Sequence, residues 1–72
     1  MKEKLPTPTI PKSRKQMADE YGLEIRAFNA KLEYAGIILA HGQIMPRDQM
    51  RIYRALGPPL HVWTDQGFFR FP

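Results

Sequence analysis

The sequence predicts a small, mostly helical domain of three helices with a short β-hairpin between the second and the third. Apolar residues recur at helical spacing in three segments, Gly22, Gly36 and Gly57 end these segments, and Pro46 suits the first turn of the third. A chain of 72 residues has room for one domain with a modest core. We divide it into a flexible, basic, proline-rich arm (1–12), the helical domain (13–57) and an aromatic-rich C-terminal extension (58–72).

The first helix is predicted over residues 13–21. The Ser13 hydroxyl can accept a hydrogen bond from the first turn, and Gln16, three residues later, can complete a capping box. Met17, Ala18 and Tyr21 follow at helical spacing. Gly22 then ends the helix.

The second helix is predicted over residues 24–35, where an acidic first residue suits the positive end of the helix dipole. With Gly36 in the left-handed conformation, Ile37 would fold back on Leu32 as in a Schellman motif. Four apolar side chains form one stripe that we expect to face the core: Ile25, Phe28, Leu32 and Ala35.

Residues 37–45 contain two short apolar runs around His41-Gly42, which predicts the small hairpin. The third helix follows from Pro46 to the glycine at 57, with Met50, Tyr53 and Leu56 on its apolar face. Residues 60–71 fit either a second hairpin with a three-residue turn at 65–67 or an extended tail packed on the domain.

The stretch 14–37 has the residue types of a helix-turn-helix. The small residue Ala18 suits the point where two helices cross, and Gly22 supplies the positive φ that the turn requires. Leu23, Phe28 and Leu32 can then hold the second helix against the first.

The spacing of Ala18, Gly22, Leu23 and Phe28 resembles the helix-turn-helix of bacterial and phage regulators. The following hairpin and third helix resemble the winged arrangement of MerR-type activators and phage excisionases. The resemblance covers roughly residues 13–57. It implies a winged helix-turn-helix that binds specific double-stranded DNA sequences, as a transcription regulator or a recombination accessory factor.

A DNA-binding role assigns the exposed part of the second helix to the major groove. Arginine can pair with guanine, asparagine with adenine, and alanine can contact a thymine methyl group. Residues at the start of the first helix would contact phosphates, and those at the wing tip would reach an adjacent backbone or the minor groove. The predicted DNA-binding residues are Arg14, Lys15, Arg26, Asn29, Ala30, Lys31, His41 and Gln43.

Two features favour a different partner. The second helix carries Glu24 and Glu33 beside its basic residues, and Glu24 stands where such regulators usually have Ser or Thr. The alternative function is therefore a protein-interaction adaptor of a phage or mobile element. On the third helix, one face carries Arg47, Arg51 and Arg54, which fit a solvated surface, a phosphate contact or an acidic partner.

Four aromatic residues crowd into the C-terminal extension: Trp63, Phe68, Phe69 and Phe71. So many in one short segment should not all be exposed. They fit a cap on the core, an interface with a second copy or another protein, or a surface for base stacking beside Arg70.

Composition bounds the remaining function classes. The net charge of +4 favours a polyanionic partner, with positive ends flanking a slightly acidic middle. There is no cysteine, and His41 and His61 lack metal-ligand spacing, so we expect no metal or cofactor. No nucleophile–base pair or phosphate-binding glycine loop is present, and we expect a non-enzyme. Without a signal peptide or an apolar span, we expect a cytoplasmic protein that does not enter membranes.

Overall fold

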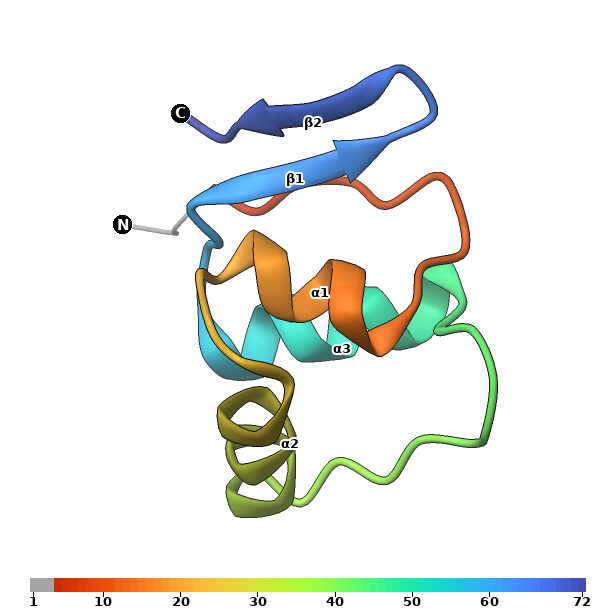
Figure 1. Cartoon of the computed structure of the whole chain (residues 1–72), viewed down its shortest axis with the longest axis vertical. Coiled ribbons are helices and arrows are strands. Elements are labelled where there is room, and N and C mark those ends of the chain that lie inside the picture. Colours follow the sequence, from red (N-terminus) through yellow and green to blue (C-terminus); the bar gives the residue numbers. More distant parts are fainter. Residues whose placement is uncertain (1–3) are drawn as a thin grey trace.

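A computed structural model describes residues 4–72 as three helices followed by a two-stranded antiparallel hairpin. The helices are Arg14–Glu20 (α1), Ile25–Tyr34 (α2) and Pro46–Leu56 (α3), and the strands are His61–Thr64 (β1) and Gly67–Arg70 (β2). In Figure 1, α1 lies in the middle of the molecule, the hairpin lies above it and α2 lies below it. The predicted fold class, three helices with a β-hairpin, is confirmed.

The core forms where the three helices meet. Its buried apolar residues come from α1 (Met17 and Ala18), α2 (Phe28 and Leu32), α3 (Ile52 and Tyr53) and the loop before α3 (Ile44). Phe28 is fully buried, as the apolar stripe predicted. Ile25 and Ala35 lie on the same predicted stripe but are exposed, because only the two central positions, Phe28 and Leu32, are buried in the core.

The helix ends follow their sequence signals. Ser13 and Gln16 form both hydrogen bonds of the capping box. After α2, the Ile37 N–H donates to the Leu32 carbonyl and the Gly36 N–H donates to the Glu33 carbonyl, which completes the predicted Schellman motif. Pro46 occupies the first turn of α3. These local signals act over a few residues, so tertiary packing does not override them.

The hairpin predicted at residues 37–45 is not formed, and that prediction is wrong. A two-residue hairpin turn at His41-Gly42 would need positive φ at His41, and among residues 4–72 only glycines have positive φ. Ile44 instead forms an isolated antiparallel bridge with Lys12, in which each N–H donates to the other residue's carbonyl. The segment is therefore a loop that joins α2 to α3, drawn in green in Figure 1.

The β-hairpin of the molecule lies in the C-terminal extension. Its register pairs Trp63 with Phe68 and Thr64 with Gly67, so the loop is Asp65-Gln66. This loop has two residues where the sequence predicted three, because Gly67 is already paired in β2. The C-terminal extension therefore forms a hairpin that contacts α1, and it is not an extended tail.

The described part of the N-terminal arm, residues 4–12, also differs from expectation. Pro6 and Lys12 are buried, Leu5 packs on the core, and the Ile10 carbonyl accepts a hydrogen bond from Gln49 Nε2 at 2.6 Å. The expected flexible arm is held along the domain in these residues. Its anchor is the buried Lys12 side chain, whose partners no local sequence pattern identifies.

Candidate nucleic-acid interface

The turn between α1 and α2, residues 21–24, forms a short corner. Gly22 has φ of +67°, and the Leu23 N–H donates to the Ala18 carbonyl at 2.9 Å. Tyr21 reaches across from this turn, stacks on Phe28 and donates its hydroxyl to the Gly57 carbonyl at 2.6 Å. The corner is therefore fixed both by its own backbone and by a link to the end of α3.

Helix α2 is held by one narrow face and leaves the others exposed. Phe28 and Leu32 are its only buried residues. Opposite them, Arg26, Ala30 and Tyr34 recur every fourth residue and form one exposed row. Tyr34 is 97% exposed, yet the sequence analysis assigned it no role. Its exposure follows from the phase of the Phe28–Leu32 stripe, which places position 34 on the opposite side of the helix.

Two predicted site residues meet where the first residue of α1 lies beside the middle of α2. Arg14 Nη1 of α1 donates to Asn29 Oδ1 of α2 at 3.2 Å. Both residues line a hollow of about 390 Å³ that also includes Glu33 and the loop residues Ile37, Ile38 and Leu39. The sequence analysis gave phosphate to Arg14 and a base to Asn29, whereas the structure brings the two side chains together. Arg14 keeps most of its five N–H donors for a further acceptor.

The backbone at the start of α2 offers hydrogen-bond donors of its own. Glu24 is the N-cap residue but makes no side-chain hydrogen bond to the first turn. The first N–H groups of a helix have no partner within the helix, and the helix dipole is positive there. A phosphate oxygen could accept from these groups.

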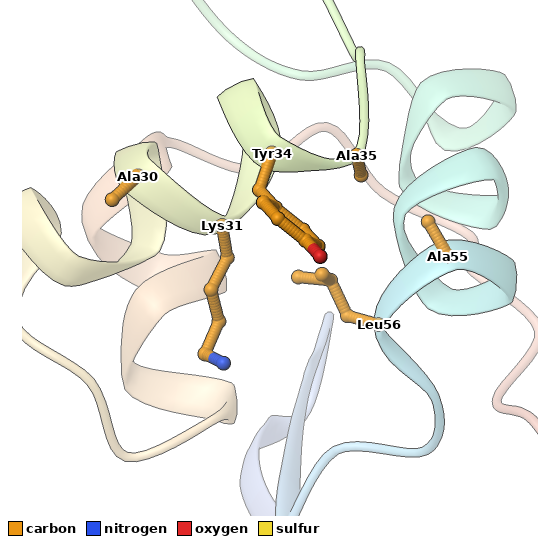
Figure 2. Close-up of a pocket in the computed structure, with 6 residues that line it drawn as sticks. All are labelled: Ala30, Lys31, Tyr34, Ala35, Ala55 and Leu56. Atoms are coloured by element: carbon orange, nitrogen blue, oxygen red, sulfur yellow. The ribbon is translucent and has the colours of Figure 1, made fainter.

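Lys31 and Ala30 border a separate hollow, of about 380 Å³, on the side of α2 that faces α3. Figure 2 shows the Tyr34 side chain extending toward Leu56 of α3, with the Lys31 side chain beside it. Lys31 therefore lies on a different side of α2 from Asn29 and Arg14. The Arg14–Asn29 pair and Lys31, which the sequence analysis placed in one DNA-binding set, therefore lie on different sides of the exposed row.

The remaining predicted DNA contacts are exposed but lie elsewhere. Lys15 is paired with Asp19 at 2.7 Å on the surface of α1. His41 and Gln43 are exposed in the loop between α2 and α3, so their placement at a wing tip is wrong. That placement depended on the hairpin at residues 37–45, which does not form.

The arginine face of α3 is present as the spacing predicted. Arg47, Arg51 and Arg54 are all exposed, while Ile52 and Tyr53 are buried. Arg51 is paired with Asp48 at 3.2 Å. The predicted apolar face is shifted toward Gln49, which is buried where Met50 is only partly so, because Gln49 donates to the Ile10 and Ile44 carbonyls.

The aromatic residues of the hairpin form a cross-strand cluster. The rings of Trp63 and Phe68 lie 4.8 Å apart between centroids, and His61 stacks on Phe68 at 4.9 Å. Trp63 and Phe71 are half-buried, whereas Phe68 and Phe69 are exposed. The cluster thus caps part of the domain and leaves two phenylalanines on the surface.

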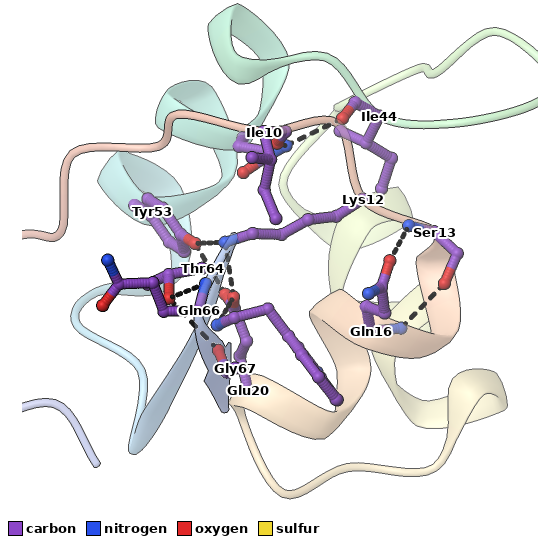
Figure 3. Close-up of polar contacts among 12 residues, drawn as sticks. Ile10, Lys12, Ser13, Gln16, Glu20, Ile44, Tyr53, Thr64, Gln66 and Gly67 are labelled. Carbon is purple, nitrogen blue, oxygen red and sulfur yellow. Dashed lines mark hydrogen bonds and ion pairs between the residues drawn. The ribbon is translucent and has the colours of Figure 1, made fainter. Parts of the chain in front are cut away.

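A buried polar network ties the arm, α1, α3 and β1 together (Figure 3). Lys12 Nζ lies 2.6 Å from Glu20 Oε2 and 3.0 Å from the Tyr53 hydroxyl, which donates to Glu20 Oε1 at 2.6 Å. Glu20 Oε2 also accepts from the Trp63 N–H at 2.8 Å. All three side chains of the triangle are completely buried.

This network buries Glu20 completely, although its neighbour Asp19 is partly exposed on the surface of α1. A buried charge needs a partner and hydrogen bonds to offset its lost hydration, and Glu20 has both. Burial, the hydrogen bond to Glu20 and the charge of Glu20 raise the pKa of the Tyr53 hydroxyl. Burial, and then the charge of Glu20, raise the pKa of Tyr21 as well. The network holds the fold together and opens on none of the hollows described above.

Among residues 4–72, no group of three or more His, Cys, Asp or Glu residues could hold a metal ion. No helix in that range combines the length and the apolar character that a membrane span requires. Comparisons of the chain with family models, curated proteins and solved structures find no match.

Proposed function

We propose that this chain binds double-stranded DNA through the exposed side of α2, as a transcription regulator or a recombination accessory factor in the cytoplasm. The observation that carries the proposal is the helix-turn-helix corner followed by α2, of which only Phe28 and Leu32 are buried. A helix that enters the major groove must be held firmly from one side and be free on the other.

Three groups support contacts to phosphate and base. The start of α2 offers uncapped N–H groups, Arg26 lies in its first turn, and Asn29, further along α2, is paired with Arg14. Asn29 accepts from Arg14 through Oδ1, which leaves its amide N–H groups free to donate to a base edge. The proposed function is binding and not catalysis.

Glu33 favours the second candidate function, a protein adaptor. It lies in the same hollow as Arg14 and Asn29, where a carboxylate would repel phosphate. The exposed apolar side chains of Tyr34 and Ile38, on α2 and just after it, would suit a protein surface instead.

Duplex binding measured by fluorescence anisotropy at two salt concentrations tests the proposal. For the parent chain, the association constant should fall steeply with salt. Arg26→Ala should weaken binding about tenfold or more. Arg47→Ala removes the same charge at the far end of α3 and should leave the affinity within about threefold. Salt-independent or undetectable binding, or equal effects of the two substitutions, would reject the α2 interface and favour the adaptor.

A further inference from the structure

The outer edge of β2 has no backbone partner. The sheet contains only β1 and β2, and among residues 4–72 no backbone hydrogen bond reaches the side of β2 that faces away from β1. The outer edge of β1 differs, because the Trp63 N–H there donates to Glu20. An exposed strand edge is a template for pairing with another strand.

The register shows which groups of β2 face outward. In an antiparallel pair, residues alternate between hydrogen-bonded and non-hydrogen-bonded positions. The Phe71 N–H donates to the Leu60 carbonyl, and Trp63 directs its N–H away from β2. The pair Trp63–Phe68 is therefore non-hydrogen-bonded, and so is the pair formed by Arg70. The N–H and C=O groups of Phe68 and Arg70 consequently point outward from the hairpin.

We propose that the outer edge of β2 pairs with the same edge of a second copy of this chain, giving a symmetric dimer with a continuous four-stranded sheet. In this arrangement a twofold axis passes beside Phe69, and Phe68 of each copy lies opposite Arg70 of the other. Each of these two pairs exchanges two hydrogen bonds, so all four outward groups on each strand are satisfied.

The side chains favour a second copy of this chain over another occupant. At the axis the two Phe69 rings, each 50% exposed in the single chain, meet at a non-hydrogen-bonded position where side chains are closest. Each Arg70 lies across from Phe68, a cation beside an aromatic ring. An axis at Arg70 would instead place two like charges opposite one another, which is unfavourable.

Sedimentation velocity of the full chain over a concentration series tests the proposal. The parent should pass from monomer to dimer as its concentration rises. Phe69→Arg and Phe69→Glu each place like charges at the axis and should raise the dissociation constant about tenfold. Gln66→Arg and Gln66→Glu make the matched charge changes in the hairpin loop, away from the edge, and should leave the constant within about twofold.

Mixing the two charged variants separates dimer contacts from folding defects. An equimolar mixture of Phe69→Arg and Phe69→Glu should recover a heterodimer, because opposite charges then meet at the axis. Arg70→Pro removes one outward N–H and should give a monomer whose near-ultraviolet circular dichroism retains the Trp63 signal. The proposal would be overturned by a parent chain that stays monomeric at millimolar concentration. It would also be overturned by a dimer that neither Phe69→Arg nor Arg70→Pro weakens. A mixture of the two charged variants that fails to associate, while both remain folded, would overturn it as well.

Discussion

Glu20 is the residue on which the largest number of separate segments depend. Its carboxylate accepts from Lys12, Tyr53 and the Trp63 backbone, and its own carbonyl accepts from the Leu60 N–H at 3.0 Å. Removing one partner of a buried ion pair leaves an uncompensated charge, which costs about 3–5 kcal/mol. A domain of this size has little more stability than that to lose.

We therefore expect Glu20→Gln to lower the free energy of unfolding by about 3–5 kcal/mol, measured by urea denaturation. The exposed pair Lys15–Asp19 is the matched control, and Asp19→Asn should cost about 0.5 kcal/mol or less. Adding Lys12→Met to Glu20→Gln should recover part of the loss, because no buried charge then remains. Equal costs for Glu20→Gln and Asp19→Asn would mean that the buried network does not stabilise the fold.

The buried Tyr53 and the partly buried Tyr21 make stability sensitive to alkaline pH. The pKa values of Tyr21 and Tyr53 are raised in the folded chain, whereas unfolded tyrosine ionises near pH 10. Folding therefore retains protons that the unfolded chain loses, and the stabilisation is fully present below about pH 10 and is lost as the pH rises further. We expect the free energy of unfolding to fall above about pH 10.

Urea denaturation between about pH 8 and pH 11 measures this fall. Tyr21→Phe removes one of the two titrating hydroxyls, so its stability should decline less steeply with pH even though its starting stability is lower. The starting loss reflects the missing hydrogen bond to the Gly57 carbonyl. Parallel curves for the parent and Tyr21→Phe would show that Tyr21 does not contribute to the pH dependence.

At the scale of elements, the C-terminal hairpin belongs to the folded domain. β1 contributes the Trp63 N–H to the buried Glu20, and Pro59 before it is buried. Deleting residues 60–72 exposes this carboxylate and part of the core. We expect the truncated chain to unfold at a urea concentration well below that of the parent, followed by far-ultraviolet circular dichroism. If the deletion left the stability of the helices unchanged, the hairpin would not stabilise the domain and would serve only as a surface for a partner.

The contrast between helices and hairpins explains what the sequence could predict. Helix ends depend on residues close in sequence, such as Ser13 with Gln16 and Gly36 with Ile37, and these were predictable. Strand pairing depends on which segment is available as partner. Ile44 pairs with Lys12, 32 residues away in the chain, and this choice removed the hairpin expected at residues 37–45.

The same distinction applies to the candidate site. Exposure of Arg26 and Ala30 followed from the phase of the Phe28–Leu32 stripe, which the sequence carries. The division of Lys31 from the Arg14–Asn29 pair depends on where α3 lies beside α2. Likewise, nothing local distinguishes the buried Glu20 from its exposed neighbour Asp19. The burial of a charged residue can be predicted only when the positions of its partners, distant in the sequence, are known.

At the scale of the whole molecule, the two proposed interfaces lie at opposite ends. Figure 1 shows α2 and the hairpin at the two ends of the longest axis, with α1 between them, and β2 is the outermost strand. A dimer formed through the outer edge of β2 therefore directs its two α2 helices away from one another. Regulators that place two recognition helices on one duplex need them on the same side, about one helical turn of DNA apart.

The dimer should consequently connect two duplexes instead of occupying two adjacent half-sites on one. Mixing donor-labelled and acceptor-labelled duplexes with the parent chain should give energy transfer that rises with dimer formation. At a concentration where the parent is mainly dimeric, Phe69→Arg should reduce the transfer in proportion to its lost dimer while each duplex still binds, because that substitution lies at the far end of the molecule from α2. Arg26→Ala should reduce both binding and transfer. Energy transfer that persists with monomeric Phe69→Arg would show that one chain contacts two duplexes and that the proposed dimer has no part in joining them.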